Sequence, residues 1–379
     1  MIQEFNSGLA GPKTHVLLLG VGGYKYLKDS PNAVPQQLEA ATLLGQLTSP
    51  VASIAALFEK IVTYDTKKEW SKPLGSIEIL LSPSPNSKPV LTGLNIENAS
   101  LVNIRNAYYS WKQRCDTHED NVALFFYCGH GVQKKYHYLL ADDFGEIPAN
   151  PWVGAFNFDD TRTAFYSCKA QTQVFFVDAC RQITSDMLLT DLTIPPLENP
   201  TLDGSESLNN LTLKAAASGQ SAYGKKDKPT YFTQAVLNGL DGLVARQENN
   251  EWLIETSGLG SNIYRLLELV NPSQSFKQRC QVLAGNPIDI IRRRDAPEVW
   301  LEVSCDPDAA LPLADLSCME DEDNTTITFS RPPMADPWKL NLKAGNYKLT
   351  ATFQPGGAFK DAAKKIAVIP PVKKEKIIC

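Results

Sequence analysis

The sequence lacks several features that would assign it to a common class. In its 379 residues no apolar run reaches the roughly 18 residues that a membrane-spanning helix needs. The N-terminus has no basic segment followed by an apolar one, so no secretory signal is expected. Lys and Arg number 37 against 42 Asp and Glu, and the net charge of −5 gives no basic field for nucleic acid. We therefore expect a cytoplasmic protein with no membrane span and no nucleic-acid partner.

Metal and nucleotide signals are also weak. The eight cysteines include no CxxC pair, and without a secretory signal they are expected to be reduced thiols. Cys128, His130 and His137 lack the paired spacing typical of zinc ligands, so no metal is predicted. Gly20–Gly23 is only half of a dinucleotide fingerprint, and no GxSxG elbow supports a serine nucleophile. We expect no cofactor.

What the sequence does contain is an alternation of apolar strands and amphipathic helices. Continuous apolar runs predict buried strands near 14–24, 75–81, 122–128 and 173–178. Helical spacing marks the segments 34–63 (broken near 48–50), 96–115, 159–170, 232–240 and 258–270. Order is also expected to resume with a short strand at 213–219. This alternation predicts an α/β fold with a mostly parallel central sheet flanked by helices.

A change in composition near residues 295–297 predicts a second domain. From there the chain alternates short β-type runs with Pro, Asp and Gly turns, which predicts a small β-sandwich over 295–379 with a Lys-rich tail. Residues 1–294 form the first predicted domain. It divides into a segment at about 10–181, a flexible loop at 182–213 and a segment at 214–294.

Two apolar runs end on reactive side chains. Residues 122–128 lead into Gly129-His130-Gly131, and residues 173–178 lead into Cys180. In a parallel sheet the carboxyl ends of neighbouring strands meet at one edge, so these runs can bring an imidazole beside a thiol. An imidazole can take the thiol proton and later protonate a leaving amine. The backbone N–H groups of Gly131 and Cys180 are candidates for binding an oxyanion.

At these residues the chain resembles the caspase family, which includes metacaspases, paracaspases and bacterial relatives. The resemblance rests on Tyr127-Cys-Gly-His-Gly131 and on Asp178-Ala-Cys-Arg181 about fifty residues later. It extends over about 10–290, with matching stretches at 16–24, 138–142, 216–222 and 231–235. It implies a cysteine endopeptidase in which His130 is the general base and acid and Cys180 the nucleophile. Ser218 and Gln220 would edge the substrate groove.

Departures from the family pattern refine this expectation. Caspases have Gln where this chain has Asp178, whereas metacaspases have Asp there, lining the pocket for the residue before the scissile bond. The resemblance therefore implies cleavage of a protein substrate after Arg or Lys. Arg181 stands where metacaspases have His, which suggests a divergent bacterial type. Bacterial relatives of this kind resemble proteases of antiviral defence or regulated cell death, which implies the same role here.

The predicted loop bears on that specificity. No Lys or Arg occurs from Gln182 to Leu213, so an enzyme specific for basic residues could not cut itself there. We therefore expect a protease that is active as one chain or is cut by another enzyme. Asp186, Asp191 and Asp203 would be available to an Asp-specific protease, which is one alternative. A non-catalytic caspase-fold scaffold is the other.

Two further points stay open at the level of sequence. Asp142, Asp143 and Glu146 form an acidic turn that could bind the Ca²⁺ that some metacaspases require, or could simply be solvated. The C-terminal domain shows no cluster of catalytic residue types. It is expected to hold an activating or inhibitory partner protein, to recruit substrate or to cover the active site.

Overall fold

The structure is a computed structural model that describes all residues except 183–192, 202–206, 208, 272–277 and 321–327. Its contacts divide the chain into two compact units. The first contains residues 1–237 and 255–291, and the second contains 238–254 and 292–379. Residue 294, where the first domain was predicted to end, therefore lies in the second unit. Half of the predicted loop 182–213 lies outside the described residues.

A seven-stranded sheet forms the centre of the first unit, in the order β1-β3-β2-β4-β8-β9-β12. Neighbours from β3 to β9 run parallel, and the edge strands β1 and β12 are antiparallel. Because helices cover both faces, the four strands β2, β3, β4 and β8 are buried along their whole length, as continuous apolar runs require. The strand bounds are β1 Ile2–Glu4, β2 Thr14–Val21, β3 Leu74–Ser82, β4 Val122–Cys128, β8 Thr172–Asp178, β9 Asn209–Lys214 and β12 Gln281–Ala284.

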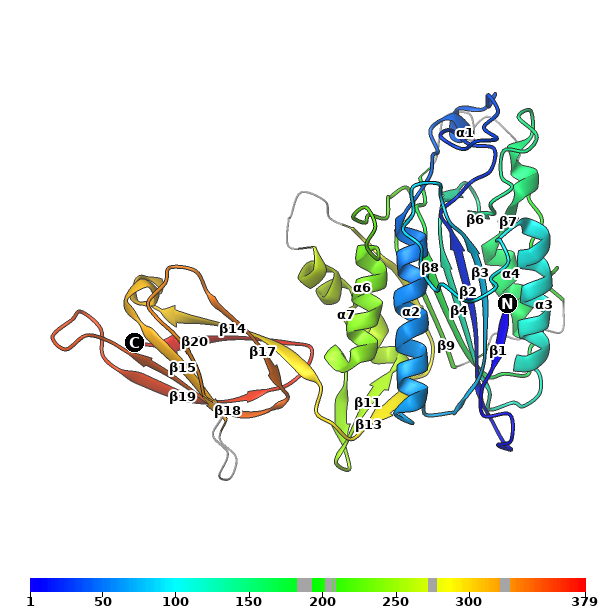
Figure 1. Cartoon of the computed structure of the whole chain (residues 1–379). Helices are drawn as coiled ribbons and strands as arrows, with labels where there is room; N and C mark the ends of the chain where they lie inside the picture. Colours follow the sequence, from blue (N-terminus) through cyan, green and yellow to red (C-terminus); the bar gives the residue numbers. More distant parts are fainter. Residues whose placement is uncertain (183–192, 202–206, 208, 272–277, 321–327) are drawn as a thin grey trace. The chain divides into compact units, whose positions relative to one another are not determined.

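Helices lie on both faces of this sheet (Figure 1). One face carries α2 (Ser49–Thr66), α6 (Tyr231–Asn238) and α7 (Thr256–Val270), and the other carries α3 (Leu101–Cys115) and α4 (Phe158–Ala164). Ser100 caps α3 by accepting a hydrogen bond from the Asn103 N–H at 3.3 Å. The buried stripe of α3 contains Ile104, Tyr108 and Trp111, as its spacing predicts.

Some predicted elements have different bounds. The segment 34–63 contains a short α1 (Glu39–Thr42) and then α2, so the predicted break near Pro50 is where the long helix begins. The helix predicted over 159–170 ends at Ala164 and gives way to a 3₁₀ turn, Phe165–Ser167. The strand predicted at 213–219 is β9, which begins earlier and ends at Lys214.

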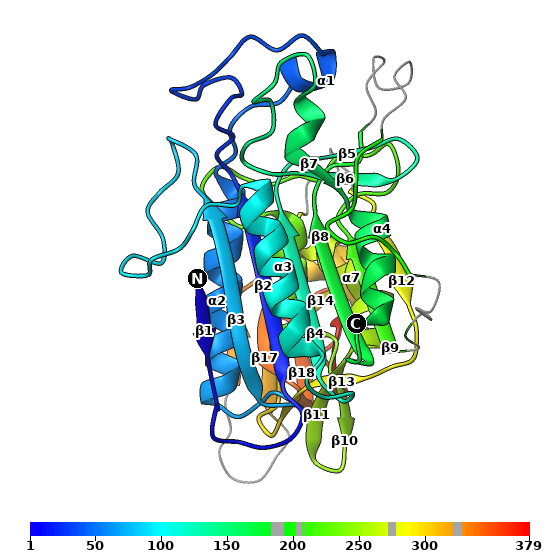
Figure 2. The same cartoon turned by 90° about the vertical axis from the view of Figure 1, so that its right-hand side faces the viewer.

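A small antiparallel sheet lies at the carboxyl ends of the parallel strands (Figure 2). It contains β5 (Gly131–Gln133), β6 (His137–Leu140) and β7 (Ala155–Asn157), in that order. A 3₁₀ turn, Pro151–Gly154, precedes β7. Because β5 begins at the residue after His130, this sheet directly continues the segment that carries the predicted base.

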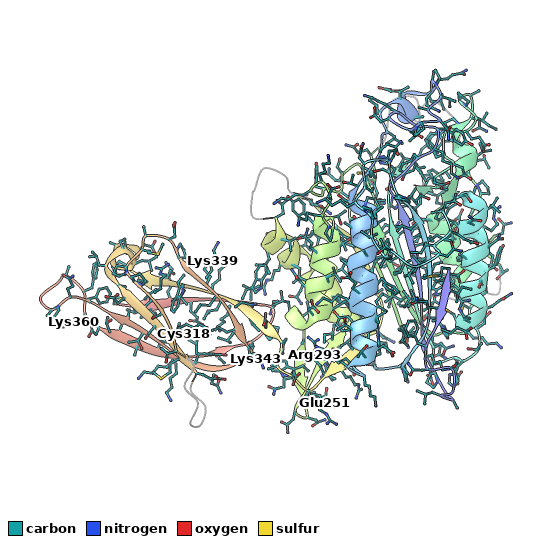
Figure 3. The ribbon with its side chains drawn as sticks, in the orientation of Figure 1. Glu251, Arg293, Cys318, Lys339, Lys343 and Lys360 are labelled. Carbon is teal, nitrogen blue, oxygen red and sulfur yellow. The ribbon has the colours of Figure 1, made fainter. Side chains whose placement is uncertain are left out.

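The second unit contains two small sheets with a shared core. Their orders are β17-β14-β20 and β16-β15-β18-β19. Alternate residues of β14 point inward, among them Val299, Leu301 and Val303, and they pack with Cys318 of β15, while Lys339, Lys343 and Lys360 are exposed (Figure 3). The bounds are β14 Glu298–Asp306, β15 Asp315–Glu320, β16 Thr328–Arg331, β17 Trp338–Lys343, β18 Gly345–Thr352, β19 Ala362–Val368 and β20 Val372–Ile378.

Shorter elements complete the described chain. They are a π-helical turn at Gly239–Leu243, the hairpin β10 (Arg246–Glu248) and β11 (Glu251–Glu255), strand β13 (Asp289–Arg293) and a 3₁₀ turn at Asp308–Leu313. The predicted fold class is confirmed: a mostly parallel sheet flanked by helices is followed along the chain by small β-sheets. Among the described helices, none combines the length and the apolar character needed to cross a membrane.

Candidate active site

The register of two neighbouring strands places His130 and Cys180 at one edge of the sheet. Strands β4 and β8 pair in parallel, and their last paired residues are Cys128 and Asp178. One step further, the Gly129 N–H donates to the Asp178 carbonyl oxygen at 3.2 Å. His130 and Cys180 each follow two residues after the end of their strand. The sheet therefore brings the two positions side by side where parallel strands expose their carboxyl ends.

Exposure singles out the same two side chains. His130 and Cys180 are partly exposed, whereas their immediate neighbours Gly129, Gly131, Ala179 and Arg181 are buried. Along each segment the chain thus comes to the surface at the reactive residue and returns to the interior. This pattern leaves His130 and Cys180 partly exposed between buried neighbours.

The segments that carry the two residues also interlock. A Cβ atom placed on Gly131 would lie 2.8 Å from the Cys180 carbonyl oxygen, closer than side-chain atoms normally approach. Further on, Val132 and Gln182 form a parallel bridge, and the Gln133 N–H donates to the Gln182 carbonyl oxygen at 3.2 Å. The backbone N–H groups of Gly131 and Cys180, predicted to bind an oxyanion, belong to these packed segments.

Contacts from distant segments fix the His130 ring. Its Nε2 donates to the Gly45 carbonyl oxygen at 2.8 Å, and since a carbonyl only accepts, Nδ1 is left as the basic nitrogen. The ring lies 4.8 Å from the Tyr24 ring, and the His130 backbone N–H donates to the Tyr24 hydroxyl at 2.6 Å. Burial lowers the pKa of His130 to about 4. The imidazole is therefore neutral at neutral pH and able to accept a proton.

The Cys180 thiol is also uncharged in this environment. Its Sγ accepts from the Ala222 N–H at 3.3 Å and lies 3.7 Å from the Ala222 carbonyl oxygen. Burial raises the pKa of Cys180; the Ala222 hydrogen bond lowers it, and the nearby charge of Asp178 adds to the rise. The resting pair is a thiol and a neutral imidazole, and a thiolate forms only if a base removes the proton.

Asp178 lies in the interior, two residues before Cys180. The side chain is 2% exposed, and its Oδ2 accepts from the hydroxyls of Thr230 and Thr233, the latter at 2.7 Å. Burial raises the pKa of Asp178 to about 6, against the effect of those hydrogen bonds. Its Oδ1 accepts no hydrogen bond of normal geometry from the described residues, and the Cys128 thiol is a further group that contacts the carboxyl and lowers its pKa. The carboxyl group therefore has one buried oxygen still able to accept.

The segment after β9 supplies the other predicted substrate-binding residues. Ser218 and Gln220 are exposed. The Gln220 carbonyl oxygen accepts from the Arg181 N–H at 2.9 Å, and the Gly219 N–H donates to the Arg181 carbonyl oxygen at 2.9 Å. Ser218 also lines a cavity of about 530 Å³ together with Arg181, Tyr264 and Gln281. Residues 219 and 220 are thus hydrogen-bonded to Arg181, the residue directly after Cys180.

Asp142 and Asp143 of the acidic turn are already bonded to other groups of the protein. Asp142 is buried, pairs with Lys25 at 3.1 Å and accepts from Ser82 and Asn98 at 2.7 Å each. Asp143 accepts from the Leu101 N–H at the start of α3. In the described part of the chain no group of three or more His, Cys, Asp or Glu side chains is arranged to hold a metal ion. The Ca²⁺ site stays a prediction.

The sequence reasoning missed His137 as a site residue, having considered it only as a metal ligand. It lies buried on β6, and its Nε2 donates to the Cys180 carbonyl oxygen at 3.1 Å. It missed Arg181 as well, whose buried guanidinium donates to the side-chain oxygens of Gln133 and Gln281. The sequence signal that could have identified His137 and Arg181 was their closeness in sequence to His130 and Cys180.

Comparisons with known proteins concern the family of the chain. Residues 51–278 match the model of the caspase domain, peptidase family C14. The chain is 28% identical over 292 residues to the uncharacterized protein y4kE of Sinorhizobium fredii, covering 73% of this chain and 81% of that protein. A solved structure, caspase-1 from Spodoptera frugiperda, aligns with 11% identity and a TM-score of 0.40, over 72% of this chain and 89% of its own.

Proposed function

The chain belongs to the caspase family, and we propose that it is a cysteine endopeptidase with Cys180 as nucleophile and His130 as general base. The observation that supports this most is the shared edge: the β4–β8 register sets both residues at one end of the sheet, and both are partly exposed among buried neighbours. A thiol and an imidazole in this relation are sufficient for nucleophilic catalysis.

The proposed reaction follows from the protonation states. His130 Nδ1 takes the proton from Cys180 Sγ as the sulfur bonds to the substrate carbonyl carbon, and the carbonyl oxygen becomes an oxyanion held by backbone N–H groups. The imidazolium then gives its proton to the leaving amine, and a thioester remains. Water, deprotonated by the same imidazole, releases the acid and restores the thiol. The Gly45 carbonyl keeps the proton on Nε2 throughout.

We propose Asp178 as the residue that selects Arg or Lys before the cleaved bond. Its buried Oδ1, which accepts no hydrogen bond of normal geometry from the described residues, and its position two residues before the nucleophile support this. Because the carboxyl is closed off beside Thr230 and Thr233, a basic side chain reaches it only when that packing opens. Ser218 and Gln220, which are exposed, would then border the bound peptide.

Turnover of fluorogenic peptides tests this function. Wild-type protein should cleave peptides ending in Arg or Lys, Cys180→Ala should abolish cleavage, and His130→Ala should lower kcat by at least about 100-fold. Asp178→Asn should remove the preference for basic residues while leaving the thiol in place. Cleavage after Asp would point to the Asp-specific alternative. No turnover with or without Ca²⁺ would instead indicate a non-catalytic scaffold.

The biological setting is a further proposal. We propose a cytoplasmic protease that cuts a dedicated protein in bacterial antiviral defence, with the C-terminal sandwich holding an activating or inhibitory partner. The resemblance of its motifs to those of bacterial caspase relatives supports the role in defence. Capture of substrates by the Cys180→Ala protein in cells, compared with wild type, tests it. Captured proteins that wild type leaves uncut would contradict the proposal.

A further inference from the structure

A second histidine packs beneath the nucleophile. His137, the first residue of β6, is fully buried, and its ring faces Phe158 with a centroid distance of 6.3 Å (β6 is labelled in Figure 2). Its backbone N–H donates to Asp159 Oδ2 at 2.8 Å, and the other oxygen of Asp159 accepts from Lys214 Nζ. The strand that carries the ring is therefore held by a partly buried ion pair.

Within the described part of the chain, the His137 ring makes one hydrogen bond. Its Nε2 lies 3.1 Å from the Cys180 carbonyl oxygen, which can only accept, so the ring proton is on Nε2. Its Nδ1 is buried and has no hydrogen-bond partner among the described residues. An unpartnered acceptor in the interior costs free energy, and a phenylalanine of similar shape would avoid that cost. What the histidine adds over an apolar ring is thus the single bond to Cys180.

The Cys180 carbonyl lies beyond the residues of β8 that pair with neighbouring strands. The pairing of β8 with β9 ends at Val177, and the pairing with β4 ends at Asp178. The next residue, Arg181, is held through both its N–H and its carbonyl by the segment 219–220. With Arg181 fixed on one side, the His137 bond fixes the peptide plane between the two residues and so the ψ angle of Cys180.

We propose that His137 is a positioning residue that holds the main chain of Cys180 so that its sulfur and its backbone N–H stay aligned on the scissile carbonyl. This rests on the proposed function of Cys180. His137 does not exchange protons in the reaction, because Nε2 is already donating and the ring is sealed from solvent. Burial, reinforced by the charges of Lys214 and Arg181, lowers the pKa of His137 to about 3, so the ring stays neutral at working pH.

Three variants test this role. His137→Phe keeps an aromatic ring but removes the hydrogen-bond donor. His137→Gln keeps a donor that can reach the Cys180 carbonyl oxygen, whereas the shorter side chain of His137→Asn cannot bring its amide that far. We expect His137→Phe and His137→Asn to lower kcat by about 10–100-fold with KM changed less than about threefold, and His137→Gln to recover most of the loss. The pH limits of activity should not move. If His137→Phe does not fold, the Gln and Asn pair gives the same comparison.

A matched control separates positioning from stability. His15 is also buried, and its Nδ1 lies 2.9 Å from the Ser76 hydroxyl, on the buried strand β2 at the opposite end from His130. His15→Phe should lower Tm about as much as His137→Phe but leave kcat within about twofold of wild type. A His137→Phe protein with normal kcat would overturn the proposal. A shifted pH limit would also overturn it, since His137 would then transfer protons.

A readout without substrate distinguishes this inference from the proposed function. Iodoacetamide labelling of Cys180, followed by mass spectrometry of its peptide, needs no turnover. We expect labelling at least about threefold faster in His137→Phe than in wild type or His15→Phe, because a loosened segment exposes the thiol. If wild type cleaves nothing but labelling changes as stated, the proposed function fails and the positioning stands. Unchanged labelling rejects the positioning in either case.

Discussion

Burial acts in opposite directions on the two reacting side chains. It raises the pKa of the Cys180 thiol and lowers the pKa of His130 to about 4. Both changes favour the uncharged forms, a thiol and a neutral imidazole. In the proposed mechanism His130 would remove the proton only when substrate is in place, which would limit the reaction of the thiol with other electrophiles. The local environment thus decides which form of the pair exists before catalysis.

The protonation state predicts how alkylation depends on pH. Because the folded-state pKa of Cys180 is raised above its ordinary value of 9.0, the thiolate forms only at high pH. We expect the labelling rate of Cys180 by iodoacetamide to rise continuously from pH 6 to about pH 9, with no plateau. The Cys180 peptide, quantified by mass spectrometry, gives the rate. A plateau near neutral pH would indicate a thiolate held by His130⁺ and would contradict the uncharged pair.

At the scale of elements, β5 and the chain after β8 act as one packed unit. Gly131 leaves space for two atoms that are hydrogen-bonded to each other, the Cys180 carbonyl oxygen and His137 Nε2, each 2.8 Å from where a Cβ would lie. The two reactive segments therefore cannot move independently. Positioning of the site comes from strand pairing and close packing rather than from a bond between the reactive side chains.

Gly131→Ala tests this packing. Since a methyl group would clash with both the Cys180 carbonyl and the His137 ring, we expect kcat to fall at least about tenfold and the free energy of unfolding to fall by about 1–3 kcal/mol. Gly8→Ala is the control, because its Cβ would meet nothing within 4 Å. Measurements of kcat and denaturant unfolding on both variants suffice. Normal activity and stability in Gly131→Ala would show that the segments are not tightly packed.

The sequence predicted those elements whose signal is local. Strands β4 and β8 are continuous apolar runs because both of their faces are covered, and His130 and Cys180 stand directly at their ends. The contacts that tune the site are not local: Gly45 lies 85 residues from His130, and Thr230 lies 52 residues from Asp178. Such partners depend on how loops pack at the sheet edge, and no spacing rule in one sequence locates them.

Strand β9 shows a second kind of miss. Its first residues, Asn209 and Asn210, are polar, so the apolar pattern placed the strand four residues late, at Leu213. In the structure β9 continues the parallel ladder from β8 beginning at Asn209, because backbone pairing does not depend on side-chain polarity. The predicted loop therefore ends earlier than its composition indicates.

For the whole molecule, three histidines with a lowered pKa predict a loss of stability in acid. Burial lowers the pKa of His15 and His130 to about 4 and of His137 to about 3, from an ordinary 6.5. Between these values the unfolded chain binds more protons than the folded one, so the stability present above pH 6.5 is lost as pH falls toward 4. Asp178, with its pKa raised to about 6, acts in the opposite sense over part of this range.

Denaturant unfolding at a series of pH values measures this dependence. We expect the free energy of unfolding to fall by several kcal/mol, on the order of 1 kcal/mol per pH unit for each histidine, between pH 6.5 and pH 4. His15→Phe should have a shallower slope, since one titrating group is removed. Equal stability at pH 7 and pH 4 would show that the rings are protonated in the folded protein.

The order of the central sheet has a practical consequence for anyone trimming this protein. The family match begins at residue 51, yet β2, at residues 14–21, separates β3 from β4 and pairs with both. In a fragment limited to 51–278, strands β3 and β4 would each lack a neighbour with which they pair, β2. His130 would also lose its hydrogen bond to the Gly45 carbonyl oxygen. Cloning boundaries taken from the match alone would yield insoluble material; the amino-terminal fifty residues belong in every expression plasmid.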